Sequence, residues 1–197
     1  MQPSLFPNET FSRPDGLRFV TDFLSPTEEA ALLAAIGRLD LTEARYKQYT
    51  ARRRVASFGG TFDYDSNELR AAPAIPDSLA PLREKVATWL AVDPALFVHM
   101  LVAEYRPGTP LGWHRDVPDF ESIVGISVLG NARMKFRPYP PAAGRSDSAF
   151  ELDLPPRCAY VLEGAARWKW QHSIVKTQEQ RYSISLRTRR GAPLLLR

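Results

Sequence analysis

Two histidines and one aspartate in the second half of the chain could together bind a metal ion. His114 and Asp116 are separated by one residue, and His172 lies far downstream. Two imidazoles and a carboxylate are the protein ligands of a non-haem iron(II) site, where they leave the remaining coordination positions of the metal open. A co-substrate and dioxygen could bind at those positions, so the pattern predicts redox chemistry rather than passive binding.

A histidine and an aspartate at this spacing also occur by chance, so the sequence around them has to support the interpretation. They follow an expected strand that ends at Tyr105 and a turn rich in proline and glycine, and another expected strand comes after them. His172 lies near the start of a later strand, so the ligands could project from a rigid sheet edge. The chain has 3 histidines. The remaining one, His99, lies within an alternating strand, where we expect a packed or hydrogen-bonded side chain.

Helical patterns come first along the chain, and strand patterns follow. Residues 25–28 (SPTE) have the form of a capping box with proline at the first helical position, and apolar residues at helical spacing follow them. A second helix is expected over residues 78–90, because its apolar residues fall on one side. Residues 45–64 are rich in arginine, aromatic residues and glycine, which predicts short strands or a mobile flap rather than a helix.

From residue 96 onward the pattern changes to the period of a strand. The expected strands cover residues 96–105, 123–129, 132–137, 149–154 and 158–162, a short segment around Ile174, and residues 181–188. Helices followed by many short strands predict an α+β fold whose strands form two sheets or a barrel. A chain of 197 residues is expected to form one domain, residues 1–197.

Composition narrows the classes of protein that the chain can represent. The hydrophobic share of 44% and the charged share of 24% are ordinary for a water-soluble domain, and no apolar stretch approaches the length of a membrane span. The first residues lack the basic segment and apolar run of an export signal. The single cysteine, Cys158, cannot form an internal disulfide. We therefore expect a reducing, cytoplasmic location, no membrane association and no disulfide-linked partner.

Charge suggests a polyanionic partner without proving one. The chain has 26 basic and 22 acidic residues, for a net charge of +4. The basic residues gather around residues 45–54, 133–137 and 187–197. Such a distribution suits nucleic acid. The alternative is a set of solvated surface charges with no partner.

Two arginines and two serines share one face of the expected strand 181–188. Residues separated by an even number point the same way on a strand, so Arg181, Ser183, Ser185 and Arg187 lie together. Guanidinium groups that point into a barrel need anionic partners, and a dicarboxylate held by forked hydrogen bonds would supply them. The alternative is a basic outer face. The nearby metal-ligand pattern favours the inward orientation.

Three segments carry a resemblance to a known family. They are residues 105–116 (YRPGTPLGWHRD), 167–174 (RWKWQHSI) and 181–187 (RYSISLR). Together they resemble the AlkB family of iron(II)- and 2-oxoglutarate-dependent dioxygenases, and the resemblance runs from about residue 101 to residue 189. Upstream, residues 52–59 (RRRVASFG) are similar to the segment that forms a substrate-covering flap in such proteins.

The resemblance implies a double-stranded β-helix, or jelly roll, with the N-terminal helices packed on its outside. It implies that Fe(II) is bound by the catalytic residues His114, Asp116 and His172. Arg181 would bind the distal carboxylate of 2-oxoglutarate, and Tyr105 would add a hydrogen bond. Arg187 would lie near the proximal carboxylate and Asp116. In this family, 2-oxoglutarate and dioxygen are consumed, succinate and carbon dioxide are formed, and a hydroxylated N-methyl group leaves as formaldehyde.

The chain departs from the family pattern at three places. Ala103 and Ser183 stand where many members carry asparagine, so we expect 2-oxoglutarate to bind with altered contacts. After Asp116, residues 117–120 (VPDF) lack the acidic residue that DNA-repairing members place two positions beyond the aspartate. This last departure weakens the expectation of DNA alkyl repair specifically.

Demethylation of an alkylated nucleobase in DNA or RNA is our leading hypothesis for the reaction. An enzyme that acts on a base must reach it outside the stack, and aromatic side chains can then hold it while basic neighbours hold phosphate. Residues 40–65 form the candidate substrate-covering flap, and its candidate substrate residues are Tyr46, Tyr49, Arg53 and Phe58. One alternative is that these aromatic residues only pack the flap on the barrel. The others are the same chemistry on a protein side chain, a modified tRNA or a small molecule, and a non-catalytic nucleic-acid-binding barrel.

Overall fold

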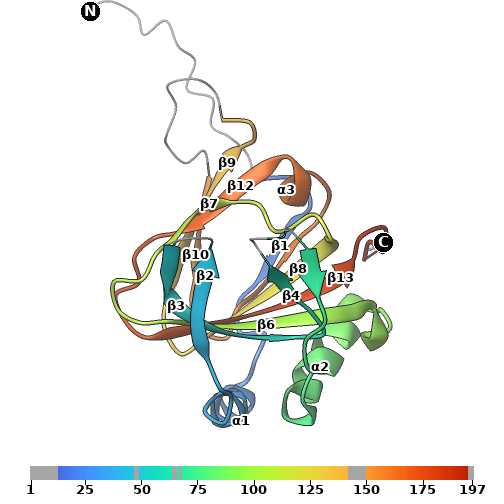
Figure 1. Cartoon of the computed structure of the whole chain (residues 1–197), viewed down its shortest axis with the longest axis vertical. Coiled ribbons are helices and arrows are strands. Elements are labelled where there is room, and N and C mark those ends of the chain that lie inside the picture. The colour runs from blue at the N-terminus through green and yellow to red at the C-terminus, as the bar shows by residue number, and fades with distance from the viewer. Residues whose placement is uncertain (1–12, 47–48, 64–65, 67, 142–149, 195–197) are drawn as a thin grey trace, which may run out of the picture.

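The computed structural model of the chain describes residues 13–46, 49–63, 66, 68–141 and 150–194 (Figure 1). Its strands form a seven-stranded sheet, a four-stranded sheet and a two-stranded hairpin. The larger sheet has the order β1 (Leu17–Val20), β11 (Ala159–Leu162), β8 (Phe120–Val128), β13 (Arg181–Arg189), β6 (Phe97–Tyr105), β3 (Tyr49–Phe58) and β2 (Thr42–Tyr46). The smaller sheet has the order β10 (Phe150–Leu154), β9 (Ala132–Pro138), β12 (Trp170–Ile174) and β7 (Leu111–His114). The hairpin consists of β4 (Thr61–Asp63) and β5 (Glu68–Arg70).

The two faces of the larger sheet pack against different layers, because successive side chains of a strand point to opposite faces. On β6, Ala103 and Tyr105 face the smaller sheet and share a core with Met134 and Phe136 of β9. Val102, which directly precedes Ala103 and points the other way, belongs to a second core on the opposite face. The result is an antiparallel sandwich, and the expected jelly-roll class is confirmed by its similarity to solved oxygenase structures, which are described below.

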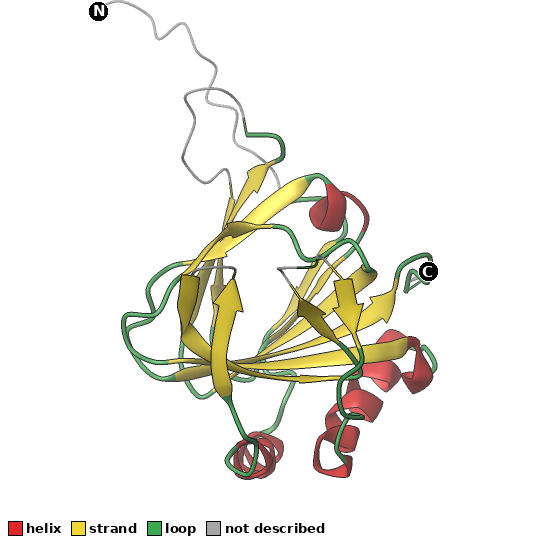
Figure 2. Ribbon diagram, in the orientation of Figure 1, coloured by secondary structure: helices red, strands yellow, loops and turns green. Residues whose placement is uncertain are grey.

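The long helices α1 (Pro26–Ile36) and α2 (Ala80–Leu90) lie on the outer face of the larger sheet (Figure 2). The predicted capping box is present at α1, where the Glu28 amide donates to Ser25 Oγ at 3.2 Å and the Ser25 amide donates to Glu28 Oε2 at 2.7 Å. The predicted apolar side of α2 is buried, and the helix follows a short 3-10 turn, Asp77–Leu79. Placement of the N-terminal helices outside the barrel is therefore confirmed.

Charged residues on the outer face of the smaller sheet are paired with each other. Arg133 Nε lies 2.8 Å from Asp153 Oδ1, and Lys135 Nζ lies 3.1 Å from Glu151 Oε1. These pairs join β9 to β10 across their ladder. The basic residues at positions 133 and 135 are thus balanced by acidic neighbours, as the solvated-surface alternative expects.

Three elements differ from the sequence-based expectation. Strand β3 has 10 residues, and its C-terminal half, residues 54–58, pairs with β6 inside the larger sheet. Residues 54–58 of the candidate flap therefore belong to the sandwich. Strand β7 and the short helix α3 (Gly164–Trp168) lie where we expected a turn and an aromatic segment. Over the described ranges, the structure contains no helix long and apolar enough to cross a membrane.

Candidate metal and co-substrate site

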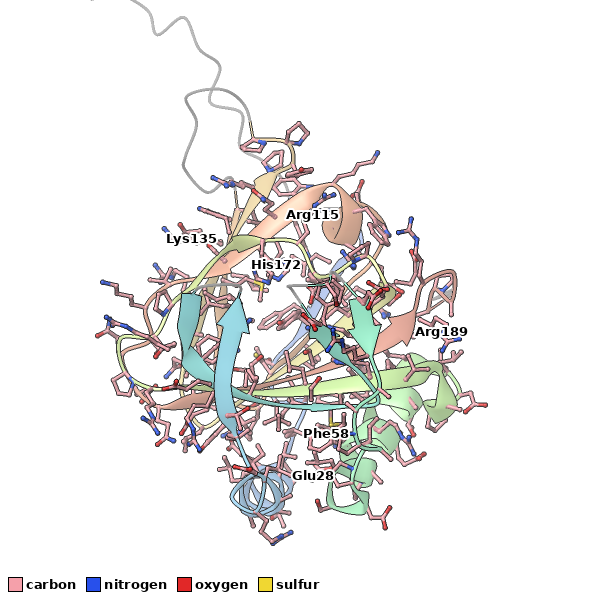
Figure 3. The ribbon with its side chains drawn as sticks, in the orientation of Figure 1. Glu28, Phe58, Arg115, Lys135, His172 and Arg189 are labelled. Carbon is pink, nitrogen blue, oxygen red and sulfur yellow. The ribbon has the colours of Figure 1, made fainter. Side chains whose placement is uncertain are left out.

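The three predicted ligands converge at one end of the smaller sheet. His114 ends β7, His172 lies on β12 directly opposite it in the ladder, and Asp116 follows β7 by two residues. One nitrogen or oxygen atom from each of these side chains lies within 4.8 Å of the others. The imidazole centroids are 4.3 Å apart, and His172 Nε2 is 3.6 Å from Asp116 Oδ2. His172 points from β12 into the space between the sheets (Figure 3).

Hydrogen bonding and burial favour neutral histidines and an ionised Asp116, which are the protonation states that bind a divalent cation. His114 Nδ1 lies 2.9 Å from the Gly112 carbonyl, to which it donates, so Nε2 is left for a metal. Burial lowers the pKa of His114, and burial with the neighbouring His114 lowers the pKa of His172 to about 3, so both rings are neutral at pH 7. Burial alone would raise the pKa of Asp116, but the charge of Arg187 and the nearby imidazoles hold it below its ordinary value. The donor set therefore fits Fe(II).

Arg187 orients the carboxylate of the set. Its Nη2 donates to Asp116 Oδ1 at 2.8 Å, and the other oxygen, Oδ2, is the one that faces His172. The predicted proximity of Arg187 to Asp116 is confirmed. A carboxylate fixed through one oxygen presents the other in a single direction, as positioning partners of metal ligands do.

Arg181 is ready to bind an anion. The side chain is 0% exposed, and its Nε donates to Ser127 Oγ at 2.9 Å. Its Nη1 and Nη2 have no hydrogen-bond partner among the residues that the structure describes. The guanidinium carbon lies 5.1 Å from the ring centroid of Tyr105. Buried donors without partners are costly, so this arginine fits a carboxylate supplied by a ligand such as 2-oxoglutarate.

A small cavity lies beside the three predicted ligands, and it is lined by Tyr105, whose ring is next to the Arg181 guanidinium. The cavity, of about 50 Å³, is also lined by the three predicted metal ligands and the inward face of β13. Ser183 and Ser185 form that face, and they line up across the sheet with Ala103 and Gly125. The expectation that the arginines and serines of residues 181–187 share the inward face is confirmed, and two of the departures from the family pattern, Ala103 and Ser183, border this cavity.

Tyr160 is a cavity residue that sequence analysis missed. It lies on β11, is 6% exposed and faces the cavity beside Tyr105 and Asp116. Its ring crosses Gly125 on β8, where an added Cβ would lie 2.1 Å from the ring carbon Cζ. Burial raises the pKa of Tyr160, so the phenol keeps its proton at neutral pH. The sequence signal was Gly125 itself, since a glycine inside a strand often marks close approach of another group.

The predicted substrate residues lie in different places. Arg53 is 8% exposed and lines the cavity, so its placement agrees with a role near the site. Phe58 was a wrong choice for stacking on substrate: it packs in the core under the helices, on the sheet face opposite to Ser57 and the site (Figure 3). Tyr46 of β2 and Tyr49 of β3 are partners in the ladder of these two strands, and their side chains lie outside the described residues.

The sandwich holds a histidine–aspartate–histidine cluster beside an arginine whose two terminal nitrogens have no partner on the described part of the chain. This combination defines the class of non-haem oxygenases that use a carboxylate co-substrate. The family model of the 2OG-Fe(II) oxygenase superfamily matches residues 16–191, and the chain belongs to this superfamily. Its members use Fe(II), 2-oxoglutarate and dioxygen.

Curated relatives of the chain carry AlkB-type names. It is 28% identical to the alkylated DNA repair protein ALKBH8 homolog of Arabidopsis thaliana, over 90% of this chain and 59% of that protein. It is also 28% identical to the tRNA (carboxymethyluridine(34)-5-O)-methyltransferase ALKBH8 of Macaca fascicularis, over 82% of this chain and 24% of that protein. The chain thus spans only part of the length of these relatives.

Two solved structures show the same fold at low sequence identity. OsALKBH1 superimposes with a TM-score of 0.65 and 15% identity, covering 90% of this chain and 100% of that one. A Pseudomonas putida prolyl-4-hydroxylase superimposes with a TM-score of 0.58 and 19% identity, covering 89% of this chain and 93% of that one. The resemblance to AlkB-like dioxygenases seen in the sequence is therefore confirmed.

Proposed function

We propose that the chain is an iron(II)- and 2-oxoglutarate-dependent dioxygenase that oxidatively removes alkyl groups from bases of nucleic acid. The observation that carries the chemistry is the meeting of His114, Asp116 and His172 within 4.8 Å, on a cavity next to the partner-free donors of Arg181. One set of atoms suits Fe(II), and the other suits a carboxylate. Neither arrangement has an evident purpose in packing alone.

Each residue has a proposed part in this reaction. The two histidines and Asp116 would hold Fe(II), which with dioxygen supplies the oxidising power. Arg181 would bind the distal carboxylate of 2-oxoglutarate with help from Tyr105, and Arg187 would keep Asp116 oriented. In the proposed reaction, 2-oxoglutarate would lose carbon dioxide and take up one oxygen atom of dioxygen to become succinate, and the other oxygen atom would hydroxylate the N-alkyl carbon. For an N-methyl group, the product then separates into the free amine and formaldehyde.

Pairs of arginine and aromatic side chains next to the site support nucleic acid as the substrate. The guanidinium carbon of Arg115, which lies between two of the proposed ligands, is 3.8 Å from the ring centroid of Tyr139. The guanidinium carbon of Arg137 likewise lies 4.5 Å from the ring centroid of Trp113. A guanidinium stacked on a ring keeps N–H groups at its edge for phosphate, and exposed rings can stack with bases. The relatives named above act, by their names, on DNA and on tRNA.

The proposal also includes the substrate-covering flap, the contacts of the base and the location of the protein in the cell. Residues 40–65 would include the substrate-covering flap, with Arg53 reaching the cavity from β3. Tyr46 and Tyr49, at the β2–β3 turn, remain proposed contacts of the base. A cytoplasmic location suits Cys158, because burial raises the pKa of its thiol to about 12 and keeps it unreactive.

The test is a turnover assay with two products. The purified protein is supplied with Fe(II), ascorbate, 2-oxoglutarate and methylated DNA or RNA oligonucleotides, single- and double-stranded, and succinate and formaldehyde are measured. We expect formaldehyde from at least one methylated oligonucleotide and none from the Asp116→Ala variant. Succinate without formaldehyde from every oligonucleotide would contradict nucleic acid as substrate but leave the dioxygenase in place. No succinate under any condition would contradict the dioxygenase itself.

A further inference from the structure

His99 connects the proposed metal ligands, across neighbouring strands of the larger sheet, to the turn that follows β3. The side chain is 3% exposed and lies on β6. Its Nδ1 is 3.2 Å from Arg187 Nη1, and its Nε2 is 3.0 Å from Ser57 Oγ on β3. The sequence-based expectation of a hydrogen-bonded side chain is met, and both partners are polar groups near the site.

The direction of these hydrogen bonds is fixed by the atoms at each end. Ser57 Oγ lies 2.6 Å from the Gly60 carbonyl, which only accepts, so the serine donates its single hydroxyl proton there. Ser57 must therefore accept from His99 Nε2–H. Arg187 only donates, so His99 Nδ1 must accept from it. Burial, with the charge of Arg187, lowers the pKa of His99 to about 3, which agrees with this neutral tautomer.

Arg187 uses both ends of its guanidinium fork in this arrangement. Nη1 donates to His99, while Nη2 donates to Asp116 Oδ1 at 2.8 Å. A fork held at two points cannot rotate without losing one hydrogen bond. An unbroken chain of hydrogen bonds thus runs from the Gly60 carbonyl through Ser57, His99 and Arg187 to the carboxylate of Asp116.

The far end of this chain is a tight turn against β6. Gly59, which precedes Gly60 between β3 and β4, has φ +77°, and an added Cβ would lie 2.0 Å from the Val98 carbonyl. The turn borders a cavity of about 480 Å³, which is separate from the metal-site cavity. Gly59 of the turn and His99 line that cavity together with Arg189 and Arg190. The hydrogen-bond chain therefore begins beside open space and ends at the metal site.

We propose that His99 is a positioning residue that couples the β3–β4 turn to the metal ligand Asp116 through Arg187. His99 keeps the guanidinium aligned so that Oδ1 of Asp116 stays occupied and Oδ2 stays directed at the metal. Because coupling is reciprocal, metal binding must also steady the turn. This inference depends on the metal site and not on the identity of the substrate.

The first test compares two substitutions by titration of the metal-free protein with Co(II), read from the visible absorption of the bound ion. His99→Gln can still accept from Arg187 and donate to Ser57, whereas His99→Leu fills a comparable volume and can do neither. We expect the Gln variant to bind Co(II) within about threefold of the wild type and the Leu variant about 10- to 100-fold more weakly. Ser122→Ala, which removes another buried hydroxyl that bonds to Glu163 at 3.1 Å, is the control and should leave the affinity unchanged.

The second test measures amide hydrogen exchange of residues 57–60 with and without Co(II). In the wild type and in His99→Gln, we expect metal binding to slow exchange at this turn. In Ser57→Ala, which cuts the chain on the side away from the metal, Co(II) should still bind but the slowing should be lost.

Three outcomes would overturn the proposal. The first is wild-type Co(II) affinity in His99→Leu. The second is an equal loss of affinity in the Gln and Leu variants, which would assign His99 to packing alone. The third is undiminished slowing of exchange at the turn in Ser57→Ala, which would show that the turn responds to the metal by another route.

Discussion

Two arginines on the same face of β13 have opposite hydrogen-bond environments. Both terminal nitrogens of Arg187 have protein partners, Asp116 and His99, and only its Nε has none among the described residues. Arg181 is more deeply buried but has one protein partner on the described part of the chain, Ser127, and two terminal nitrogens without any. A buried guanidinium in this state is incomplete until an anion binds. We therefore assign ligand binding to Arg181 and ligand positioning to Arg187.

Arg181→Lys should weaken binding of 2-oxoglutarate. An ammonium cannot reproduce a forked contact and the bond to Ser127 together, so we expect the dissociation constant to rise about 10- to 100-fold. Calorimetric titration of 2-oxoglutarate into the Zn(II)-loaded protein measures this without turnover. Arg133→Lys is the matched control, because Arg133 is exposed and pairs with Asp153 on the outer face. Equal affinities of wild type and Arg181→Lys would remove Arg181 from the co-substrate site.

The buried histidines should make the metal-free protein sensitive to mild acid. The pKa values of His99 and His172 are lowered to about 3, so the folded protein leaves both neutral while the unfolded chain protonates them below about pH 6.5. The unfolded state then binds more protons, and the free energy of unfolding falls as pH drops from about 6.5 toward 3. Between about pH 7.5 and 5.5, each histidine should account for about 1.4 kcal/mol of lost stability.

Urea denaturation of the metal-free wild type and His99→Gln at these two pH values measures the contribution of His99. Glutamine does not titrate, so the variant should lose about 1.4 kcal/mol less stability than the wild type on acidification. Identical losses in the two proteins would mean that His99 is already protonated, or becomes so, in the folded state.

At the scale of elements, the sequence predicted those parts whose local signals agree with their packing. Residues 25–28 contain a complete capping signal, and α1 begins there because the same atoms form both hydrogen bonds. The alternation at 181–187 gave the correct inward face because its polar residues share one face of the strand and its apolar residues, Ile184 and Leu186, share the other. The convergence of His114, Asp116 and His172 could be predicted because two histidines and an aspartate are residue types that bind iron(II) together, whatever elements carry them.

Other elements could not be predicted because tertiary contacts decide them. Nothing local to residues 54–58 shows that they pair with β6, so the inward position of Arg53 and the outward position of Phe58 were not visible in advance. The role of Tyr160 depends on Gly125, which is 35 residues away along the chain but directly opposite in the ladder. Such pairs are set by strand order, which a single sequence does not contain.

Gly125→Ala should move the Tyr160 ring and so affect the co-substrate cavity. The new Cβ would lie 2.1 Å from Cζ of the ring, and the cavity is the open space on that side of the sheet. We expect a loss of about 1–3 kcal/mol in stability and weaker binding of 2-oxoglutarate. Tyr160→Leu in the same chain should reduce the stability loss, because the clash is removed. Urea denaturation of the wild type, the two single variants and the double variant measures the free energy of coupling between the two positions. Gly112→Ala is the control, because its new Cβ meets nothing within 4 Å. Additive effects of the two substitutions would contradict the contact.

For the molecule as a whole, the site lies at the junction of the two sheets. His114 and His172 belong to the smaller sheet, while Arg181, Arg187 and Tyr105 belong to the larger one. In the described part of the site, the contact of Arg187 with Asp116 joins the two groups directly. Bound metal and 2-oxoglutarate would therefore link the two sheets at one end, and we expect their binding to raise the free energy of unfolding of the whole domain.

Metal binding should raise the thermal stability of the whole domain. A ligand that binds only the folded state, at about 100 times its dissociation constant, adds about 2.7 kcal/mol, which corresponds to a rise of roughly 5–10 °C in Tm for a domain of this size. Differential scanning calorimetry with and without Zn(II) measures the rise, and adding 2-oxoglutarate to the Zn(II) form should increase it further. Asp116→Ala should lose the response, whereas Asp153→Ala, an exposed carboxylate on the outer face, should keep it. A Zn(II)-dependent rise of equal size in Asp116→Ala would mean that the ion stabilises the fold from somewhere other than the junction of the sheets.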